Sequence, residues 1–241
     1  MSAFWIEPDW PAPPNVRAAS TLRPGGFSQG VYAGLNLGAH VGDDPAHVAT
    51  NRRLLWEALN LPAEPLWLSQ VHGAVVIDAD KPASLTGDAA VTRRAGLVCA
   101  VMTADCLPIL LCDRSGTCVA AVHAGWRGLA GGVVEAAVAA LKRPDLMAWL
   151  GPAIGPQAFE VGGEVRQAFC DRLGHCSSAF SRTGEDRWLA DLYELARIAL
   201  QRAGVVDLYG GGYCTHSDPE RFYSYRRDGR TGRMATLIWR E

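Results

Sequence analysis

An apolar stretch in the middle of the chain, broken once by polar residues, limits the folds open to it. Residues 97–102 and 107–112 form two apolar runs, and the window that joins them contains Asp105 and Pro108. A membrane-spanning helix needs about 20 consecutive apolar residues, so this window is too short and too interrupted to span a bilayer. Each run instead has the length and composition of a strand buried on both faces. The sequence therefore predicts a strand-rich core and no contact with a membrane.

Composition and charge are those of an ordinary folded domain. Of the 241 residues, 49% are hydrophobic and 20% are charged, which argues against disorder as the main state. Lys and Arg number 23 against 25 Asp and Glu, a formal charge of −2. Binding to a nucleic-acid backbone relies on a basic excess, so nucleic acid is not an expected partner. The first residues lack the basic start and apolar core of a secretory signal, and we expect a cytoplasmic protein.

Apolar periodicity and turn residues predict helices and strands in mixed order. Asp44 is typical of an N-cap and Pro45 of a first helical position, which predicts a helix over residues 45–59. The turn at residues 114–116 predicts that residues 117–123 return antiparallel to the preceding strand. Further helices are expected over residues 133–141, 163–173 and 191–203. A strand with its exit loop is expected over residues 66–72, and further strands over residues 74–77, 148–150, 206–209 and 234–239.

These elements predict an α+β fold. Because helices and strands alternate irregularly, we expect one domain over residues 1–241, a layered sandwich of mixed sheets and helices. Residues 1–16 become proline-rich from residue 6 onward and are expected to run as an extended N-terminal arm.

Seven cysteines occur, and no two of them are spaced as CxxC, which excludes a structural zinc ribbon. An odd number of cysteines in a chain without a secretory signal argues against a disulfide framework. Cys106 and Cys214 have neighbours that indicate chemistry. Four others lie among apolar residues and are expected to be small buried hydrophobes: Cys99, Cys112, Cys118 and Cys170.

Three segments place a reactive side chain where an apolar strand gives way to a turn. They contain His72, Cys106 and His123. Two imidazoles and a thiolate are a suitable ligand set for a catalytic zinc, which has three protein ligands and lowers the pKa of bound water to about 7. Asp105 is expected to act as an outer-shell partner or a general base. From spacing alone the alternative stays open that these residues are merely structural.

Glycines and arginines close to these segments are candidates for binding an anion. Gly125 and Gly128 precede the helix expected from residue 133, where free backbone N–H groups and the helix dipole favour an anion. A tight turn with close helix packing accounts for these glycines equally well. Guanidinium groups bind phosphate in bidentate fashion, although any single arginine is more often a solvated surface group. Arginines occur on the first helix, beside His123 and within residues 223–228.

Taken together, these motifs resemble the YfiH family, also called the DUF152 or polyphenol oxidase family. The resemblance covers nearly the whole chain and includes long motifs such as Gln-Val-His-Gly and His-Ala-Gly-Trp-Arg-Gly. One departure is Gln157-Ala158, where many relatives carry cysteine, and this position is not among the expected metal ligands. The segments that carry the resemblance are residues 35–38, 40–43, 51–52, 70–73, 102–108, 122–128, 151–156, 159–162 and 224–228.

The resemblance implies a fold, a metal and a reaction. The fold is a layered αβ sandwich related to cysteine-hydrolase toxins. The metal is zinc, with copper as a substitute, bound at the positions of His72, Cys106 and His123. The reaction is cleavage of adenosine, inosine, guanosine or methylthioadenosine by phosphate, with deamination of adenosine in some members. The implied catalytic residues are the three ligands and Asp105, and the candidates for holding phosphate are Arg52, Arg127 and Arg226.

Three alternatives compete with the function that the resemblance implies. A four-copper laccase site needs about ten histidines, whereas this chain has six and no His-x-His pair, so that site is rejected. Cys106 and His123 could instead form a nucleophile–base dyad that hydrolyses an amide, for example in a cell-wall precursor. A binding module without catalysis is the least favoured alternative, because three reactive groups lie at strand ends.

Overall fold

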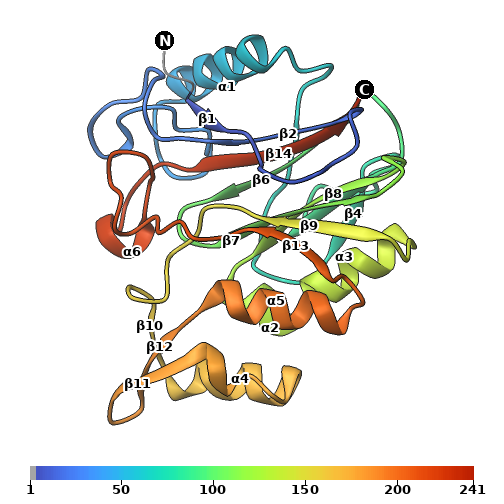
Figure 1. The fold of residues 1–241 in the computed structure, drawn as a ribbon. Coiled ribbons are helices and arrows are strands. Elements are labelled where there is room, and N and C mark those ends of the chain that lie inside the picture. Colours follow the sequence, from blue (N-terminus) through green and yellow to red (C-terminus); the bar gives the residue numbers. More distant parts are fainter. Residues whose placement is uncertain (1–3) are drawn as a thin grey trace.

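Two stacked β-sheets, covered by helices on both outer faces, make up most of residues 4–241, which the computed structural model describes (Figure 1). The five-stranded sheet has the order β1 (Trp5–Ile6), β2 (Val16–Thr21), β14 (Met234–Arg240), β6 (Val98–Thr103) and β3 (Leu66–Trp67). The six-stranded sheet has the order β13 (Asp207–Gly210), β9 (Leu146–Leu150), β7 (Leu107–Asp113), β8 (Val119–Ala124), β5 (Ala89–Thr92) and β4 (Val76–Asp78). The α+β layered sandwich expected from the sequence is thereby confirmed.

Helices cover the outer face of each sheet. Helix α1 (Pro45–Leu59) packs on the five-stranded sheet, and α2 (Trp126–Gly131), α3 (Val133–Leu141) and α5 (Leu192–Arg202) pack on the six-stranded sheet (Figure 1). Beyond α2 and α5 lies α4 (Gly163–Leu173), together with a small sheet of β10 (Glu160–Gly162), β12 (Arg187–Ala190) and β11 (Phe180–Gly184). The short α6 (Tyr225–Asp228) lies beside the loop that joins β6 to β7 (Figure 1).

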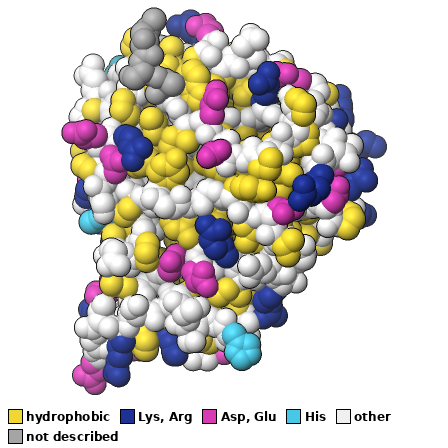
Figure 2. Space-filling view, in the orientation of Figure 1, with side chains coloured by type: hydrophobic (Ala, Val, Ile, Leu, Met, Phe, Trp, Pro, Cys, Tyr) yellow, Lys and Arg dark blue, Asp and Glu magenta, His cyan; other side chains and the backbone are white. Residues whose placement is uncertain are grey.

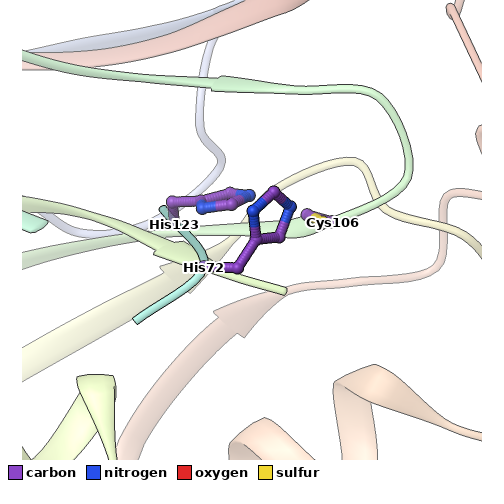
Figure 3. A group of neighbouring side chains, drawn as sticks. All are labelled: His72, Cys106 and His123. Carbon is purple, nitrogen blue, oxygen red and sulfur yellow. The ribbon is translucent and has the colours of Figure 1, made fainter. Parts of the chain in front are cut away.

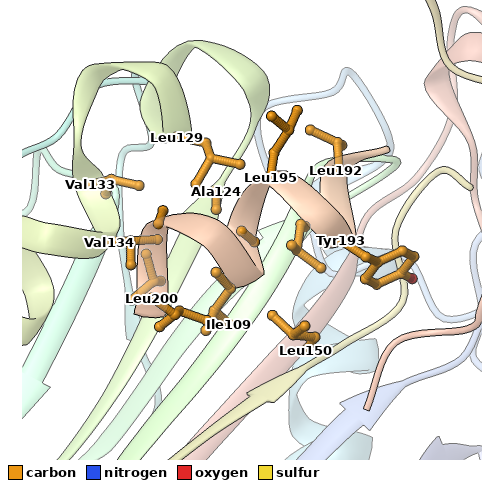
Figure 4. Packing of buried hydrophobic residues seen from close by; sticks show 14 of the residues in the cluster. Ile109, Ala124, Leu129, Val133, Val134, Leu150, Leu192, Tyr193, Leu195 and Leu200 are labelled. Carbon is orange, nitrogen blue, oxygen red and sulfur yellow. The ribbon is translucent and has the colours of Figure 1, made fainter. Parts of the chain in front are cut away.

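Strand alternation explains why the central strands are apolar throughout. In β7, Ile109 packs toward the helices while Leu110 packs toward the other sheet (Figure 4). Strand β8 does the same with Val122 and Ala121, and it pairs with β7 in antiparallel register. Every residue of both strands is buried. The prediction of strands buried on both faces is therefore confirmed, as is the antiparallel return across the tight turn.

Helix boundaries are predicted well where capping residues mark them. Helix α1 begins after Asp44, whose side chain accepts a hydrogen bond from the Ala46 N–H, and it ends at Leu59. The αL conformation of Asn60 closes this helix. The bounds of α3 and α4 agree with the prediction as well, and α5 begins after Asp191, which accepts from two backbone N–H groups. These predictions hold because the capping interactions are local.

Several details of local structure differ from the predictions or go beyond them. Of the strand and exit loop predicted over residues 66–72, only Leu66–Trp67 pairs with β6, because the chain then crosses to the other sheet. Strand β8 ends at Ala124, before the glycines, and residues 126–131 form helix α2, which was not predicted. Residues 225–228 form the short helix α6. The hairpin of β11 and β12 was missed.

The ends and the surface of the molecule bear on partners. Residues 7–15 of the expected arm run without regular structure between β1 and β2, and residues 1–3 lie outside the described residues. On the face drawn in Figure 2, basic side chains are interspersed with acidic and hydrophobic ones and form no single basic patch. No helix in the described part of the chain has the length and apolarity that crossing a membrane requires.

Candidate metal centre

His72, Cys106 and His123 come together in space from three separate segments (Figure 3). Their ligand atoms all lie within 4.8 Å of one another. His123 is the penultimate residue of strand β8, whereas Cys106 and His72 lie on the two connections β6–β7 and β3–β4. Each of these connections passes from the five-stranded sheet to the six-stranded sheet. The cluster therefore forms where the chain changes sheets, at one edge of the sandwich.

Asp88, which is not among the residues predicted from the sequence, holds two of the three residues in place. Its buried carboxylate accepts hydrogen bonds from the backbone N–H groups of His72 (2.9 Å) and Gly73 (2.7 Å) and lies 2.8 Å from Nδ1 of His123. Its backbone carbonyl accepts from the His123 N–H (2.7 Å). Its partners lie 15 to 35 residues away in sequence, so no local pattern marks it.

The charge of Asp88 fixes the orientation of His123. Burial alone would raise the pKa of Asp88, but hydrogen bonds from His123 and from the backbone of Gly73 and His72 outweigh burial and leave that pKa lowered. The ionised carboxylate favours a proton on Nδ1 of His123. Nε2 is then the ring nitrogen that is free to bind a metal.

The thiol of Cys106 is unusually acidic for a buried group. Burial would raise its pKa, but the neighbouring rings of His123 and His72 lower it. The pKa of His123 is raised in turn, because the interactions with the Cys106 thiolate and with Asp88 outweigh its burial. A thiolate is the form of cysteine that binds metals and acts as a nucleophile. Cys106 is therefore chemically distinct from the other buried cysteines.

Apart from Cys170, the cysteines that the sequence analysis assigned fall into the predicted groups of inert and reactive thiols. Burial raises the pKa of Cys112 to about 12 and of Cys118 to about 11, and it also raises that of Cys99, as expected of inert hydrophobes. Cys170 differs because it is only half-buried and its Sγ lies 3.0 Å from that of Cys176. In Cys214, hydrogen bonds from Ser217 and from backbone N–H groups overcome partial burial and lower the pKa.

Glycine at position 125 is required by the cluster itself. A Cβ on Gly125 would lie 2.8 Å from Sγ of Cys106 and 3.2 Å from Cδ2 of His72. Gly128 is packed in a similar way, since a Cβ there would lie 2.8 Å from the carbonyl oxygen of Gly73. The structure thus places these glycines in close packing, which was the alternative to an anion site.

Backbone strain is concentrated next to the cluster. His72 has φ +60° and Asp105 has φ +91°, values that residues with a Cβ rarely adopt. Asp105 is held there by hydrogen bonds from Thr215 Oγ1 (2.6 Å) and from the backbone N–H of Arg226 (2.7 Å). Strained residues of this kind persist only where the surroundings fix them, and they gather at functional sites. Asp105 is therefore held rigidly beside Cys106, its neighbour in the sequence.

The three arginines singled out from the sequence lie in different environments. Arg52 stacks over the Trp67 ring at 4.1 Å, donates to the Leu37 carbonyl and lines a cavity of about 430 Å³. Arg127 is exposed and stacks over Trp126 at 4.4 Å. The guanidinium of Arg226 donates to the Glu160 carbonyl and lies over the Phe159 ring.

The residues present fit a zinc ion. Two imidazole nitrogens and a thiolate are the ligands that zinc prefers, and copper accepts the same donors. The Gly125 backbone packs closely against Cys106 and His72, and the three ligand atoms lie near enough to one another to bind a single ion. The exposed member, His72, gives access from solvent. Within residues 4–241 this is the one group of three or more His, Cys, Asp or Glu side chains placed to hold a metal.

Comparison with known proteins gives one consistent family. A family model described as "Multi-copper polyphenol oxidoreductase laccase" matches residues 17–241. A Pseudomonas aeruginosa protein named purine nucleoside phosphorylase is 57% identical, and the match covers 98% of each chain. The purine nucleoside phosphorylase YfiH of Escherichia coli is 53% identical, with 97% of this chain and 98% of that protein covered.

Solved structures agree with these relatives. A Neisseria meningitidis protein of the DUF152 family superposes with a TM-score of 0.95 at 51% identity, covering 99% of this chain and 100% of the other. YlmD from Geobacillus stearothermophilus gives a TM-score of 0.94 at 33% identity, covering 100% of this chain and 97% of the other. Sequence and structure thus agree over nearly the full length, and the chain belongs to the DUF152, or YfiH, family.

Proposed function

We propose that this chain is a zinc-dependent purine nucleoside phosphorylase that also deaminates adenosine. The proposed substrates are adenosine, inosine, guanosine and methylthioadenosine, together with inorganic phosphate, in the cytoplasm. The observation that carries the proposal is the cluster of His72, Cys106 and His123, oriented by Asp88. The names of its relatives support the phosphorolysis, and the ligand types of the cluster support zinc.

Phosphorolysis exchanges one bond for another at C1′ of the ribose. A phosphate oxygen forms a bond to C1′ while the bond from C1′ to the base nitrogen breaks, and the electron pair leaves with the purine. The base nitrogen gains a proton to give the free purine, and the other product is the sugar 1-phosphate, which is ribose 1-phosphate for adenosine, inosine and guanosine. Because the transition state resembles an oxocarbenium ion, the protein contributes mainly by positioning phosphate and nucleoside. Arg52, Arg127 and Arg226 are the arginines proposed from the sequence to hold phosphate.

The metal ligands have roles of their own. A zinc ion bound by His72, Cys106 and His123 would supply Lewis-acid polarisation and an activated water molecule. Asp88 keeps the proton of His123 on Nδ1, and Cys106 contributes the negative charge of its thiolate. Copper is the alternative ion for the same ligands.

Deamination requires a proton carrier near the purine. Water adds at C6, the bond from C6 to the amino nitrogen breaks, and the nitrogen leaves as ammonia after it gains a proton. Asp105 is the proposed carrier, since it directly precedes Cys106. Both of its carboxylate oxygens accept hydrogen bonds, from Thr215 and Arg226, so one bond must open before the carboxylate accepts a proton.

Product analysis tests this function. The zinc-loaded protein is incubated with adenosine and phosphate, and the products are separated by chromatography. Adenine with ribose 1-phosphate is the expected result of phosphorolysis, and inosine is the expected result of deamination. If neither product forms while zinc is bound, the proposal is wrong.

One observation favours a second function. The Cys106 thiolate, the His123 ring and the Asp88 carboxylate follow one another in the order of a nucleophile, a base and an orienting group. The same residues therefore suit hydrolysis of an amide, for example in a cell-wall precursor. A mass spectrum that shows an acyl group on Cys106 after incubation with such a substrate would favour this function over the first.

A further inference from the structure

Four basic side chains lie in or around the loop at residues 38–42, and we call them the basic cluster: His40, Arg52, Arg230 and Arg233. His40 lines two cavities of about 430 Å³ each. Arg230 and Arg233 line one of these cavities, and Arg52 lines the other. Neither lining includes an aspartate or a glutamate. The walls on both sides of His40 are therefore positive or neutral.

The arginines of the basic cluster are anchored by backbone oxygens. The acidic groups that act on them, Glu64 on Arg52 and Asp105 on Arg233, lie beyond salt-bridge distance. Nη1 of Arg233 donates to the carbonyls of residues 231 and 232, both at 2.9 Å. Nε and Nη2 of Arg52 donate to the carbonyl of residue 37. Among residues 4–241 neither guanidinium forms a salt bridge, whereas Arg53, next to Arg52, pairs with Glu57 at 4.0 Å. Guanidinium groups held in this way keep their orientation, and without a carboxylate at contact distance they stay available to an anion.

The loop itself is built to receive these arginines. A Cβ on Gly38 would lie 2.8 Å from Cγ of Arg233. Gly42 has φ +88°, and a Cβ there would lie 3.0 Å from Nη2 of Arg230. Oδ1 of Asn36 accepts hydrogen bonds from the backbone N–H groups of Gly38 (3.0 Å) and Arg233 (2.9 Å). The loop and the arginines thus form one fixed unit.

The cavity beside Arg52 reaches the segments that carry the metal ligands. It is lined by Gln70 and Met102 as well as Arg52. The Gln70 amide both donates to and accepts from the Met102 backbone, at 2.8 Å each. Gln70 lies two residues before His72, and Met102 is the penultimate residue of the strand that leads to Cys106. The cavity is therefore lined by the two segments that lead to His72 and Cys106.

Charge effects agree with this proximity. Burial lowers the pKa of Arg233, and the negative charge of Cys106 opposes that shift. Partial burial and the positive charges of Arg233 and Arg52 lower the pKa of His40. The His40 ring offers at least one N–H donor in either protonation state.

We propose that His40, Arg52 and Arg233 bind the inorganic phosphate that attacks the nucleoside, with Arg230 closing the wall behind it. This assignment rests on the proposed phosphorolysis. Of the three arginines proposed from the sequence to hold phosphate, it keeps only Arg52, and it adds Arg233. The side-chain N–H groups of Arg233 and His40 orient the phosphate, and one phosphate oxygen is left to form the bond to C1′.

Direct binding of inorganic phosphate to the zinc-loaded protein tests the assignment, by isothermal titration calorimetry. We expect Arg233→Gln and Arg52→Gln each to weaken phosphate binding about tenfold or more, since each removes a charged hydrogen-bonding group. The matched control is Arg53→Gln on the same helix, which should leave the affinity unchanged. His40 is exposed and its side chain makes no hydrogen bond among the described residues, so His40→Ala should fold normally and weaken binding about threefold.

The outcomes separate this inference from the proposed function. Unchanged phosphate affinity in folded Arg233→Gln and His40→Ala overturns the inference, even if the enzyme forms ribose 1-phosphate. Weaker phosphate affinity supports the site, even if no phosphorolysis is found. Binding of adenosine monophosphate that is tighter than that of phosphate and depends on Arg233 would also overturn it, because the cluster would then serve a nucleotide. In steady-state kinetics, the KM for phosphate should rise while the KM for adenosine stays within about twofold.

Discussion

The two ends of the β7–β8 hairpin both rely on a buried aspartate, yet they differ in how the residues around it are brought together. At the turn, Asp113 accepts hydrogen bonds from the N–H groups of Thr117 (2.6 Å) and Cys118 (2.9 Å). At the metal centre, Asp88 accepts from groups 15 to 35 residues away. The turn is a local structure, whereas the metal centre exists only in the folded protein.

Strain also distinguishes the two ends. In the turn, positive φ falls on Gly116, which adopts it at little cost. At the metal centre it falls on His72 and Asp105, which carry a Cβ. The fold therefore fixes an unfavourable backbone where ligands must converge and avoids it where only a chain reversal is needed. We infer that the turn serves stability and that the other end serves function.

Loss of a ligand should have the largest effect. We expect Cys106→Ser to lose most of its zinc and to lower both phosphorolysis and deamination by about a hundredfold or more, because the thiolate is both the charged ligand and part of the reactive centre. Zinc per chain is measured by plasma mass spectrometry. Cys214→Ser is the matched control and should keep its zinc. Full activity in a zinc-free Cys106→Ser protein would contradict a metal mechanism.

Exchange of each aspartate for asparagine sharpens the comparison between the two ends. Asp88→Asn should weaken zinc affinity about 10- to 100-fold, because His123 loses the carboxylate that orients its ring. Asp113→Asn should leave zinc affinity unchanged. Competition with a fluorescent chelator measures both affinities. Equal zinc affinity in the two variants would contradict the different roles of Asp88 and Asp113.

A methyl group added at Gly125, the N-cap of helix α2, tests the close approach of the backbone to the metal ligands. Gly125→Ala places a Cβ against Sγ of Cys106, so zinc affinity should fall about tenfold. Gly131→Ala, in the same helix, has no heavy atom within 4 Å of its new Cβ and should bind zinc normally. It should also raise the free energy of unfolding by up to about 1 kcal/mol, because glycine weakens helices. Chelator competition and thermal unfolding distinguish the two variants.

The smallest effect concerns acid stability at the turn. Burial alone would raise the pKa of Asp113, but hydrogen bonds from Thr117 and Cys118 lower it. A carboxylate with a lowered pKa stabilises the fold above its unfolded pKa of about 3.9, and this contribution is lost as pH falls through the lower folded value. Asp113→Asn should therefore cost about 1–3 kcal/mol at pH 7 and progressively less below about pH 4. Urea unfolding at several pH values measures the difference, and a constant difference down to pH 3 would be inconsistent with it.

What the sequence predicts follows the same division between local and distant contacts. The cap at Asp44 and the antiparallel return after residue 113 depend on neighbours in sequence, and both are confirmed. The three candidate ligands could be proposed because each lies in the sequence where an apolar segment meets a turn. Asp88 could not, since its partners meet it only after both sheets have formed. The crossing of the chain between sheets after Trp67 was hidden for the same reason.

The basic cluster shows this limit most clearly. Arg233 lies far along the chain from His40 and Arg52, and it joins them through Asn36 and Gly38. No spacing in the sequence marks that arrangement. By contrast, Arg127 and Arg226 were prominent because they lie beside conspicuous motifs, yet their guanidinium groups stack on neighbouring aromatic rings.

The most direct test of the account is a zinc titration of the metal-free protein in the presence of adenosine and phosphate, with ribose 1-phosphate followed by phosphorus NMR. We predict that the rate of ribose 1-phosphate formation rises in proportion to bound zinc and levels off at one ion per chain. We also predict that Cys106→Ser stays inactive at the same zinc concentrations. Formation of ribose 1-phosphate at a rate independent of zinc, or none at full zinc occupancy, would contradict the account.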